Sequence, residues 1–208
     1  MNLYQYIKRH LIVIICLVVI GYSIVALIHL VFPHRIEQSF VRGESIAFVP
    51  EYNKDGSMFH AKLKIGYRQG LLIAECVIML PVMYLFYRLV EYYNIFFGLK
   101  RFWSYFIDFG CAVVVGRLPT HLLGIYTLDY LYIRATHSIY DFFDLCIGVF
   151  SIGMLGWLIP YNIRYHHYKK SHTRGMRLWQ KIKWEFQFGI KSIRMSLSPI
   201  KTWWKDVV

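Results

Sequence analysis

Long apolar segments alternate with short polar ones along this chain, and their lengths predict helices that cross a membrane. Residues 11–30 form the first segment, in which His29 is the only strongly polar side chain. Twenty residues at about 1.5 Å each cover roughly 30 Å, the thickness of a bilayer's hydrocarbon core. Three further apolar segments, 70–87, 102–118 and 141–161, predict three more spans. The pattern therefore predicts an all-α membrane protein built on a four-helix transmembrane bundle.

The composition supports this class. Of the 208 residues, 57% are hydrophobic and 18% aromatic, which is too apolar for an ordinary soluble domain of this length. No small-residue cleavage site follows the first apolar segment, so we expect a retained helix rather than a removed signal peptide. The membrane domain is expected to cover residues 1–162.

Small side chains inside the predicted spans indicate close packing. Glycines at 148, 153 and 156 would let another helix approach the fourth span, and simple packing is the interpretation we favour. The four cysteines fall one to a span with no CxxC spacing, so neither a disulfide nor a metal site is indicated: Cys16, Cys76, Cys111 and Cys146.

The segment between the first two spans, residues 32–69, has a different texture. Residues 58–65 alternate apolar and polar side chains, which is typical of a strand with one covered face. We therefore expect a small β element lying on the outer membrane surface.

Basic residues in the short loops predict the orientation, because cytoplasmic loops carry an excess of Lys and Arg. They occur before the first span, between the second and third, and after the fourth: Lys8, Arg9, Arg88, Lys100, Arg101, Arg164, Lys169 and Lys170. Both termini are then cytoplasmic, and residues 31–69 and the loop 119–140 lie outside. Residues 31–69 fit imperfectly, with six Lys or Arg against four acids.

Residues 163–208 form a basic tail. Apolar side chains recur there at helical spacing beside two tryptophans: Leu178, Ile182, Phe186, Ile190 and Ile193, with Trp179 and Trp184. Lysines and arginines lie between them, as in an interfacial amphipathic helix. We expect this helix to bind the anionic cytoplasmic leaflet. That role accounts for much of the +12 net charge without nucleic acid as a partner.

Two aspartates are the candidate chemistry. Asp129 lies in the outer loop and Asp144 one turn inside the fourth span, so both are expected at the outer membrane face. A charge within the bilayer costs on the order of 2.5–3.5 kcal/mol on insertion scales, which argues for a use. Two adjacent carboxyl groups share one proton, so the ionised member can activate water while the neutral member hydrogen-bonds the scissile carbonyl. The plain alternative is that Asp129 caps a turn and Asp144 favours a helix N-terminus.

Four stretches of the chain are similar in order and spacing to motifs of one family. They are GESIAFVP at 43–50, NKDGSMF at 53–59, VGRLPTHLLGIYTLD at 115–129 and YDFFDLCI at 140–147. On these stretches, over most of residues 10–160, the chain resembles the lipoprotein signal peptidase (signal peptidase II) family. The resemblance implies that Asp129 and Asp144 are the catalytic pair.

The same resemblance implies an aspartic endopeptidase of the bacterial inner membrane that needs no metal or organic cofactor. Its substrate would be a diacylglyceryl-modified prolipoprotein, cut just before the lipidated cysteine. Supporting or substrate-binding roles would fall on residues of the matching motifs: Gly43, Glu44, Asn53, Gly56, Arg117, His121 and Asp141. Arg117, Thr120 and His121 replace the Asn, Asp and Arg of the family pattern, and Asp141 replaces an Asn beside the second aspartate.

Two other functions use the same residues. His121, His137 and the acids could bind a metal or serve an acyl transfer between lipids or lipoproteins, with His137 and Asp141 paired at i,i+4 if that stretch is helical. Alternatively the protein is a membrane scaffold in which the acids pair with Arg117 and Arg134. Salt-bridged acids would then stay ionised and make poor proton donors.

Overall fold

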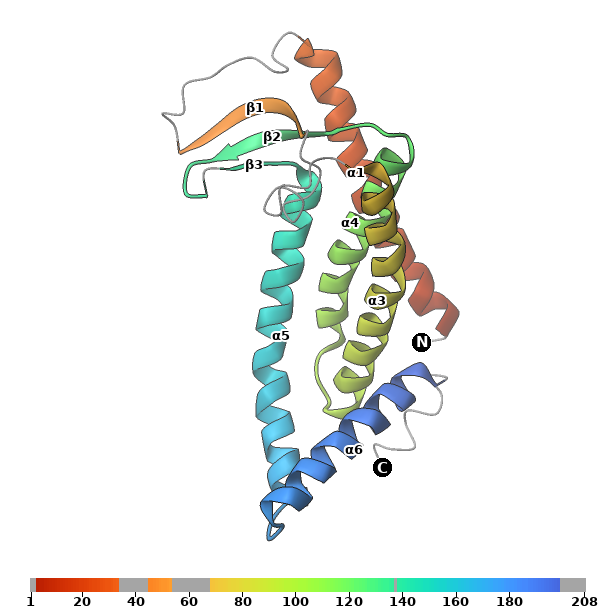
Figure 1. Cartoon of the computed structure of the whole chain (residues 1–208), viewed down its shortest axis with the longest axis vertical. Coiled ribbons are helices and arrows are strands. Elements are labelled where there is room, and N and C mark those ends of the chain that lie inside the picture. The colour runs from red at the N-terminus through yellow and green to blue at the C-terminus, as the bar shows by residue number, and fades with distance from the viewer. Residues whose placement is uncertain (1–2, 34–44, 54–67, 137, 199–208) are drawn as a thin grey trace.

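The computed structural model describes residues 3–33, 45–53, 68–136 and 138–198, with side chains from residue 8 onward. Figure 1 shows a bundle of long helices with a small sheet at one end and a helix crossing the other end. In chain order the elements are α1 (Leu3–Val31), β1 (Ile46–Asn53), α3 (Gln69–Phe96), the 3-10 turn η2 (Arg101–Ser104), α4 (Tyr105–Leu122), β2 (Thr127–Ile133), β3 (Ser138–Tyr140), α5 (Phe142–His172) and α6 (Leu178–Leu197).

Three of these helices are long and apolar enough to cross a membrane: Lys8–Val31 in α1, all of α3 and all of α5. This confirms three of the predicted spans. Within the described residues α4 is long enough but does not meet the same standard, because polar side chains such as Asp108 and Arg117 lower its mean hydropathy. It nevertheless packs against α1, α3 and α5. A fourth span at α4 remains a prediction.

The helices extend beyond the predicted apolar segments. α3 runs on to Phe96 and α5 to His172, each about ten residues past the expected end. In α3 the added turns are held by burial, because Val90 and Tyr92 are each only 1% exposed. Hydropathy identifies the part of a helix in hydrocarbon, whereas these last turns are stabilised by packing against other parts of the protein.

The sheet has the order β1-β2-β3, and both pairings are antiparallel. The prediction of a loop over 119–140 is wrong in two places. Pro119 lies in the last turn of α4, and Thr127–Ile133 is a strand. Leu128 and Tyr132 on that strand are buried, which explains why it pairs rather than remaining a loop. The β element is therefore present, while its predicted stretch 58–65 lies outside the described residues.

Buried polar side chains hold the helices together at the end of the bundle near α6. Trp157 of α5 donates to the Asn94 side chain of α3 at 2.9 Å, and Asn94 donates to Ser104 of η2 at 3.1 Å. At the same end, His10 of α1 lies 2.8 Å from the carboxylate of Asp108 in α4. These contacts satisfy buried polar groups and fix the relative positions of all four helices.

Two of the three α5 glycines allow close packing, as we predicted from the sequence. A Cβ atom on Gly153 would lie 2.1 Å from the Phe106 ring of α4, and one on Gly156 would lie 3.1 Å from Trp103 of η2. The packing interpretation is wrong for Gly148, where a Cβ atom would meet no described atom within 4 Å.

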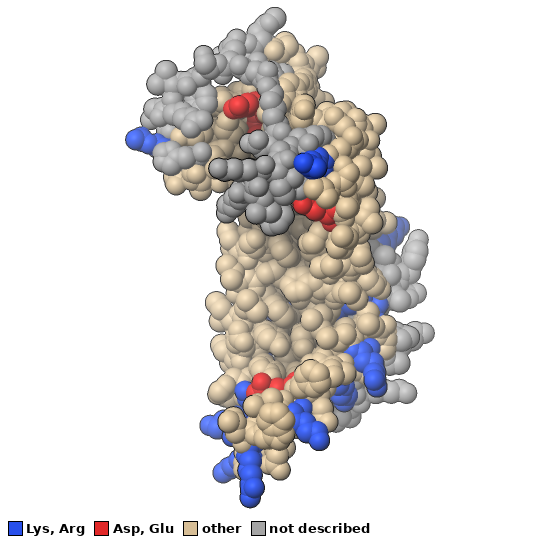
Figure 2. Space-filling view, viewed as in Figure 1, with Lys and Arg blue, Asp and Glu red and all other residues tan. Residues whose placement is uncertain are grey.

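Charged side chains gather at the two ends of the molecule, as Figure 2 shows, and leave an uncharged belt between them on the visible face. Exposed apolar side chains cover this middle region, among them Val19 of α1, Val77 of α3 and Ile152 of α5. Such a belt is expected where hydrocarbon surrounds the helices.

Candidate functional site

Three aspartates meet where the sheet joins the bundle. Asp129 comes from β2, Asp141 directly precedes α5, and Asp144 lies in the first turn of α5. One carboxylate oxygen from each lies within 4.8 Å of one from each of the others. The fold thus brings together the two predicted catalytic aspartates and the predicted supporting residue Asp141.

Arg117 of α4 bridges two of the three acids. Its Nη2 atom donates to Asp141 Oδ1 at 2.9 Å and to Asp144 Oδ1 at 3.0 Å. The Arg117 side chain is 12% exposed, Asp141 6% and Asp144 28%. The scaffold interpretation correctly anticipated that Arg117 pairs with acids, although the pairing leaves Asp144 partly open to solvent.

The N-terminus of α5 orders Asp141 and Asp144 relative to each other. The Asp144 backbone N–H donates to Asp141 Oδ1 at 2.8 Å, and the Asp141 backbone N–H donates to Asp144 Oδ2 at 3.1 Å. This is a capping box, in which each side chain satisfies the other's backbone N–H. Asp141 therefore precedes the helix as its N-cap, where we had expected the first residue of the span.

The third aspartate is positioned by the sheet. β1 and β2 pair in a register that places Glu51 opposite Asp129 and Asn53 opposite Thr127. Asn53, two residues along the strand, reaches back so that its Nδ2 donates to Asp129 Oδ2 at 2.9 Å. Among the described residues, the buried Oδ1 atom of Asp129 has no hydrogen-bond partner. A buried carboxylate oxygen without a partner is costly to ionise, which favours the protonated form of Asp129.

The site holds protons near neutral pH. Burial raises the pKa of Asp129 to about 7, helped by the charges of Asp141 and Asp144 and opposed by Arg117 and the Asn53 hydrogen bond. Burial also raises the pKa of Asp141 to about 6, against the lowering effect of Arg117. A group of acids that binds protons near neutral pH can transfer them in a reaction.

The other predicted site residues fall into two groups. His121 is buried in the last turn of α4. Gly43, Glu44 and Gly56 lie outside the described residues, as does His137. The helical pairing of His137 with Asp141 is wrong, because Ser138–Tyr140 between them is a strand.

Sequence reasoning missed the reciprocal capping of Asp141 and Asp144. A signal was present, since the sequence DFFD has the spacing of a capping box directly before an apolar helix. The bridging of both acids by one guanidinium had no such local signal, because it depends on how α4 and α5 are arranged.

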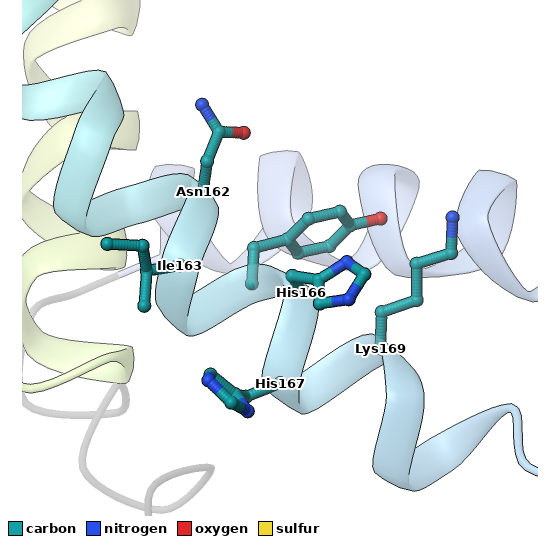
Figure 3. Close-up of a pocket in the computed structure, with 6 residues that line it drawn as sticks. Asn162, Ile163, His166, His167 and Lys169 are labelled. Carbon is teal, nitrogen blue, oxygen red and sulfur yellow. The ribbon is translucent and has the colours of Figure 1, made fainter.

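A hollow of about 470 Å³ lies elsewhere, toward the C-terminal end of α5. Figure 3 shows the α5 side chains that line it: Asn162, Ile163, Tyr165, His166, His167 and Lys169. The eighteen residues from Asp144 to Asn162 correspond to roughly 27 Å of helix. The hollow is therefore separate from the acid cluster.

Comparison with known proteins identifies a shared fold. No family model matches the chain, and no curated protein matches it. A solved structure described as a bacterial membrane enzyme is similar, with a TM-score of 0.54 and 13% sequence identity. The match covers 83% of this chain and 94% of that one. The chain thus shares the fold of a bacterial membrane enzyme over 83% of its length.

Proposed function

We propose that this protein is a membrane-embedded aspartic endopeptidase that removes signal peptides from diacylglyceryl-modified prolipoproteins, cutting before the lipidated cysteine. The observation that carries the proposal is the meeting of Asp129 and Asp144, from separate elements, in a partly buried cluster that binds protons near neutral pH. The sequence motifs around both aspartates and the shared fold with a membrane enzyme support it.

The two carboxyl groups have different surroundings, which suits different roles. Asp144 is ion-paired with Arg117 and 28% exposed, so it supplies the carboxylate that accepts a proton from water. Asp129 is buried, has a pKa of about 7 and carries an oxygen without a described partner, so it supplies the proton. Arg117 and Asp141 are positioning residues that fix the Asp144 carboxylate.

The reaction then proceeds in two balanced steps. The water oxygen bonds to the scissile carbonyl carbon while its proton passes to Asp144 and the Asp129 proton passes to the carbonyl oxygen. In the second step Asp144 gives its proton to the amide nitrogen, the carbon–nitrogen bond breaks, and Asp129 recovers a proton as the carboxylic acid forms. Both side chains end in their starting states.

The proposed setting is the bacterial inner membrane, with the termini in the cytoplasm and the acids near the outer face. The acids lie at the N-terminus of α5, one end of a helix long enough to cross a membrane. A lipid-anchored substrate would present its cleavage site at this depth, beside its own acyl chains in the bilayer.

The test is cleavage of a diacylglyceryl prolipoprotein by the full chain in lipid, with Asp129→Asn and Asp144→Asn compared at equal folded yield. Glu185→Gln is the matched control, since Glu185 lies on α6 at the far end of the molecule. We expect both aspartate variants to lose at least about 100-fold in rate, the usual scale for a positioned acid or base, while the control is unchanged. Wild-type protein that folds but does not cleave would overturn the proposal.

A second candidate function is supported by one observation. Three carboxylate oxygens within 4.8 Å of one another could bind a hard divalent cation, which would favour a metal-dependent hydrolase or acyl-transfer enzyme. A chelator added to the same assay separates the two: loss of activity that Mg²⁺ or Mn²⁺ restores would favour the metal enzyme. If instead the aspartate variants lose folded yield and the wild type is inactive, the acids serve a scaffold.

A further inference from the structure

The helix after the last candidate span, α6, presents three distinct faces. The first faces the bundle and contains its least exposed side chains: Trp184, Phe188, Ser192, Met195 and Ser196. The Phe188 ring lies 5.4 Å from that of Tyr168 in α5 and 6.4 Å from that of Tyr93 in α3. Aromatic packing therefore fixes the rotation of α6 about its own axis.

Polar contacts secure the same helix at its C-terminus and near its middle. Arg88 of α3 donates from Nε to the Ser196 backbone carbonyl at 2.8 Å and from Nη2 to that of Ser198. Near the middle of α6, Glu185 forms an ion pair with Lys169 of α5. The guanidinium binds carbonyls that a helix C-terminus leaves without partners. Because α6 is held in this way, its remaining faces have a defined orientation.

The second face is apolar and open. Its side chains recur every three or four residues and are 45–75% exposed: Trp179, Ile182, Phe186, Ile190, Ile193 and Leu197. Residues at this spacing form one stripe along a helix. A continuous stripe of large exposed apolar side chains is typical of a surface that contacts a membrane or a partner.

The third face is polar and basic, and its charge indicates that a membrane rather than a protein partner covers the apolar stripe. Lys183, Lys191 and Arg194 are exposed along it, together with Gln180 and Gln187. Residues 163–198 contain nine Lys or Arg and a single acid, Glu185. Figure 2 shows the same concentration of positive charge at this end of the molecule. A basic border beside an apolar stripe matches an anionic lipid surface.

The position of α6 relative to the bundle agrees with that match. α5 has 31 residues, or roughly 46 Å at 1.5 Å each, which exceeds a hydrocarbon core of about 30 Å. The polar side chains of the hollow, including Asn162, His166 and Lys169, begin where such a span would leave hydrocarbon. α6 starts six residues after the end of α5, at the level of the lipid headgroups.

We propose that α6 lies in the surface of an anionic leaflet, with the Trp179–Leu197 stripe inserted among the acyl chains and the basic face contacting lipid phosphates. The helix is then a lipid-binding element attached to α3 through Arg88. This inference depends on the arrangement of α5 and α6 and is independent of the proposed peptidase activity.

The test places a nitroxide label at Phe186→Cys on the apolar stripe or at Gln187→Cys on the polar face, in the full chain. Each variant is reconstituted in nanodiscs of phosphatidylcholine alone or with phosphatidylglycerol. For each label we compare the rate of collision with oxygen, which partitions into lipid, with the rate of collision with a water-soluble nickel complex. The labelled wild type gives the background from the four native cysteines, which lie in α1, α3, α4 and α5.

We expect the label at 186 to collide several-fold more often with oxygen than with the nickel complex, and the label at 187 to show the reverse. Phosphatidylglycerol should increase the preference of the label at 186 for oxygen, because the helix then inserts more deeply. Replacing Lys183, Lys191 and Arg194 with Gln should abolish the phosphatidylglycerol effect. A label at 186 that is as accessible to nickel as the label at 187 would overturn the proposal. Spin–spin coupling between labels at 186 on two molecules would also overturn it, since the stripe would then be a dimer contact.

Discussion

Replacing Arg117 with Gln tests the electrostatics of the acid cluster without assuming any activity. The substitution removes the charged bonds at 2.9 Å and 3.0 Å to Asp141 and Asp144 and leaves two carboxylates without their cation. Breaking a buried ion pair from one side typically costs 3–5 kcal/mol. Because Asp144 is 28% exposed and remains partly solvated, we expect the lower end, about 3 kcal/mol.

The cost should depend on pH in a defined direction. Asp141 has a raised pKa of about 6, so it is largely ionised at pH 8 and largely protonated at pH 5. Arg117 lowers that pKa, and its removal must raise it further. The full penalty therefore applies at pH 8, and most of the part due to Asp141 disappears at pH 5, where the carboxyl group is neutral.

Thermal unfolding of the two proteins in detergent at pH 8 and pH 5 measures this difference. A loss of 3 kcal/mol corresponds to a shift of roughly 6–12 °C in Tm at pH 8 for a chain of this size, and the shift should be clearly smaller at pH 5. Arg164→Gln is the control, since Arg164 is exposed on α5. An equal shift at both pH values, or no shift, would refute the account of the cluster.

Further predictions concern the fold and the proposed activity. Gly153→Leu should sharply reduce folded yield, because a Cβ there already meets an aromatic ring at 2.1 Å, whereas Gly148→Leu should be tolerated. Trp157→Phe removes a buried hydrogen bond donor and should cost about 1–3 kcal/mol in unfolding assays. Cleavage should decline above about pH 7, because Asp129 must be protonated to act as the acid. Asn53→Ala should move that decline to higher pH, since the Asn53 hydrogen bond lowers the pKa of Asp129; an unmoved profile would exclude Asp129 as the titrating acid.

The helical part of the fold could be read from hydropathy because each span is specified by its own residues. The segments predicted at 11–30 and 70–87 lie within helices that could cross a membrane, and so does 141–161 apart from its first residue, the N-cap Asp141. α4 is the instructive case, since Asp108 and Arg117 lower its hydropathy while both have partners inside the protein. Hydropathy alone cannot distinguish such a helix from a marginal span.

The sheet could not be read in the same way, because its strands depend on partners far along the chain. β2 pairs along most of its length with β1, some eighty residues earlier in the sequence, and its last residues also pair with β3. The pattern TLDYLYI is short and does not alternate strictly. Sequence therefore placed Asp129 at the same end of the bundle as Asp144, but in a loop rather than on a paired strand beside Asn53.

The sequence predicted that acidic side chains would come together at the site. It could not predict how their negative charges are balanced. Three carboxylates would carry three negative charges, against one guanidinium and a helix N-terminus equivalent to roughly half a positive charge. The shortage of positive charge favours the binding of protons by the carboxylates. Which carboxylate holds a proton follows from the contacts that each one makes. Arg117 and the N-terminus of α5 both stabilise Asp141 and Asp144. Among the described side chains, Asp129 accepts a hydrogen bond only from the Asn53 amide, and it is the acid with a pKa of about 7. Because the sheet supplies Asp129 and the helix N-terminus supplies Asp144, the two carboxyl groups have different surroundings, and the proposed division into proton donor and carboxylate rests on that difference.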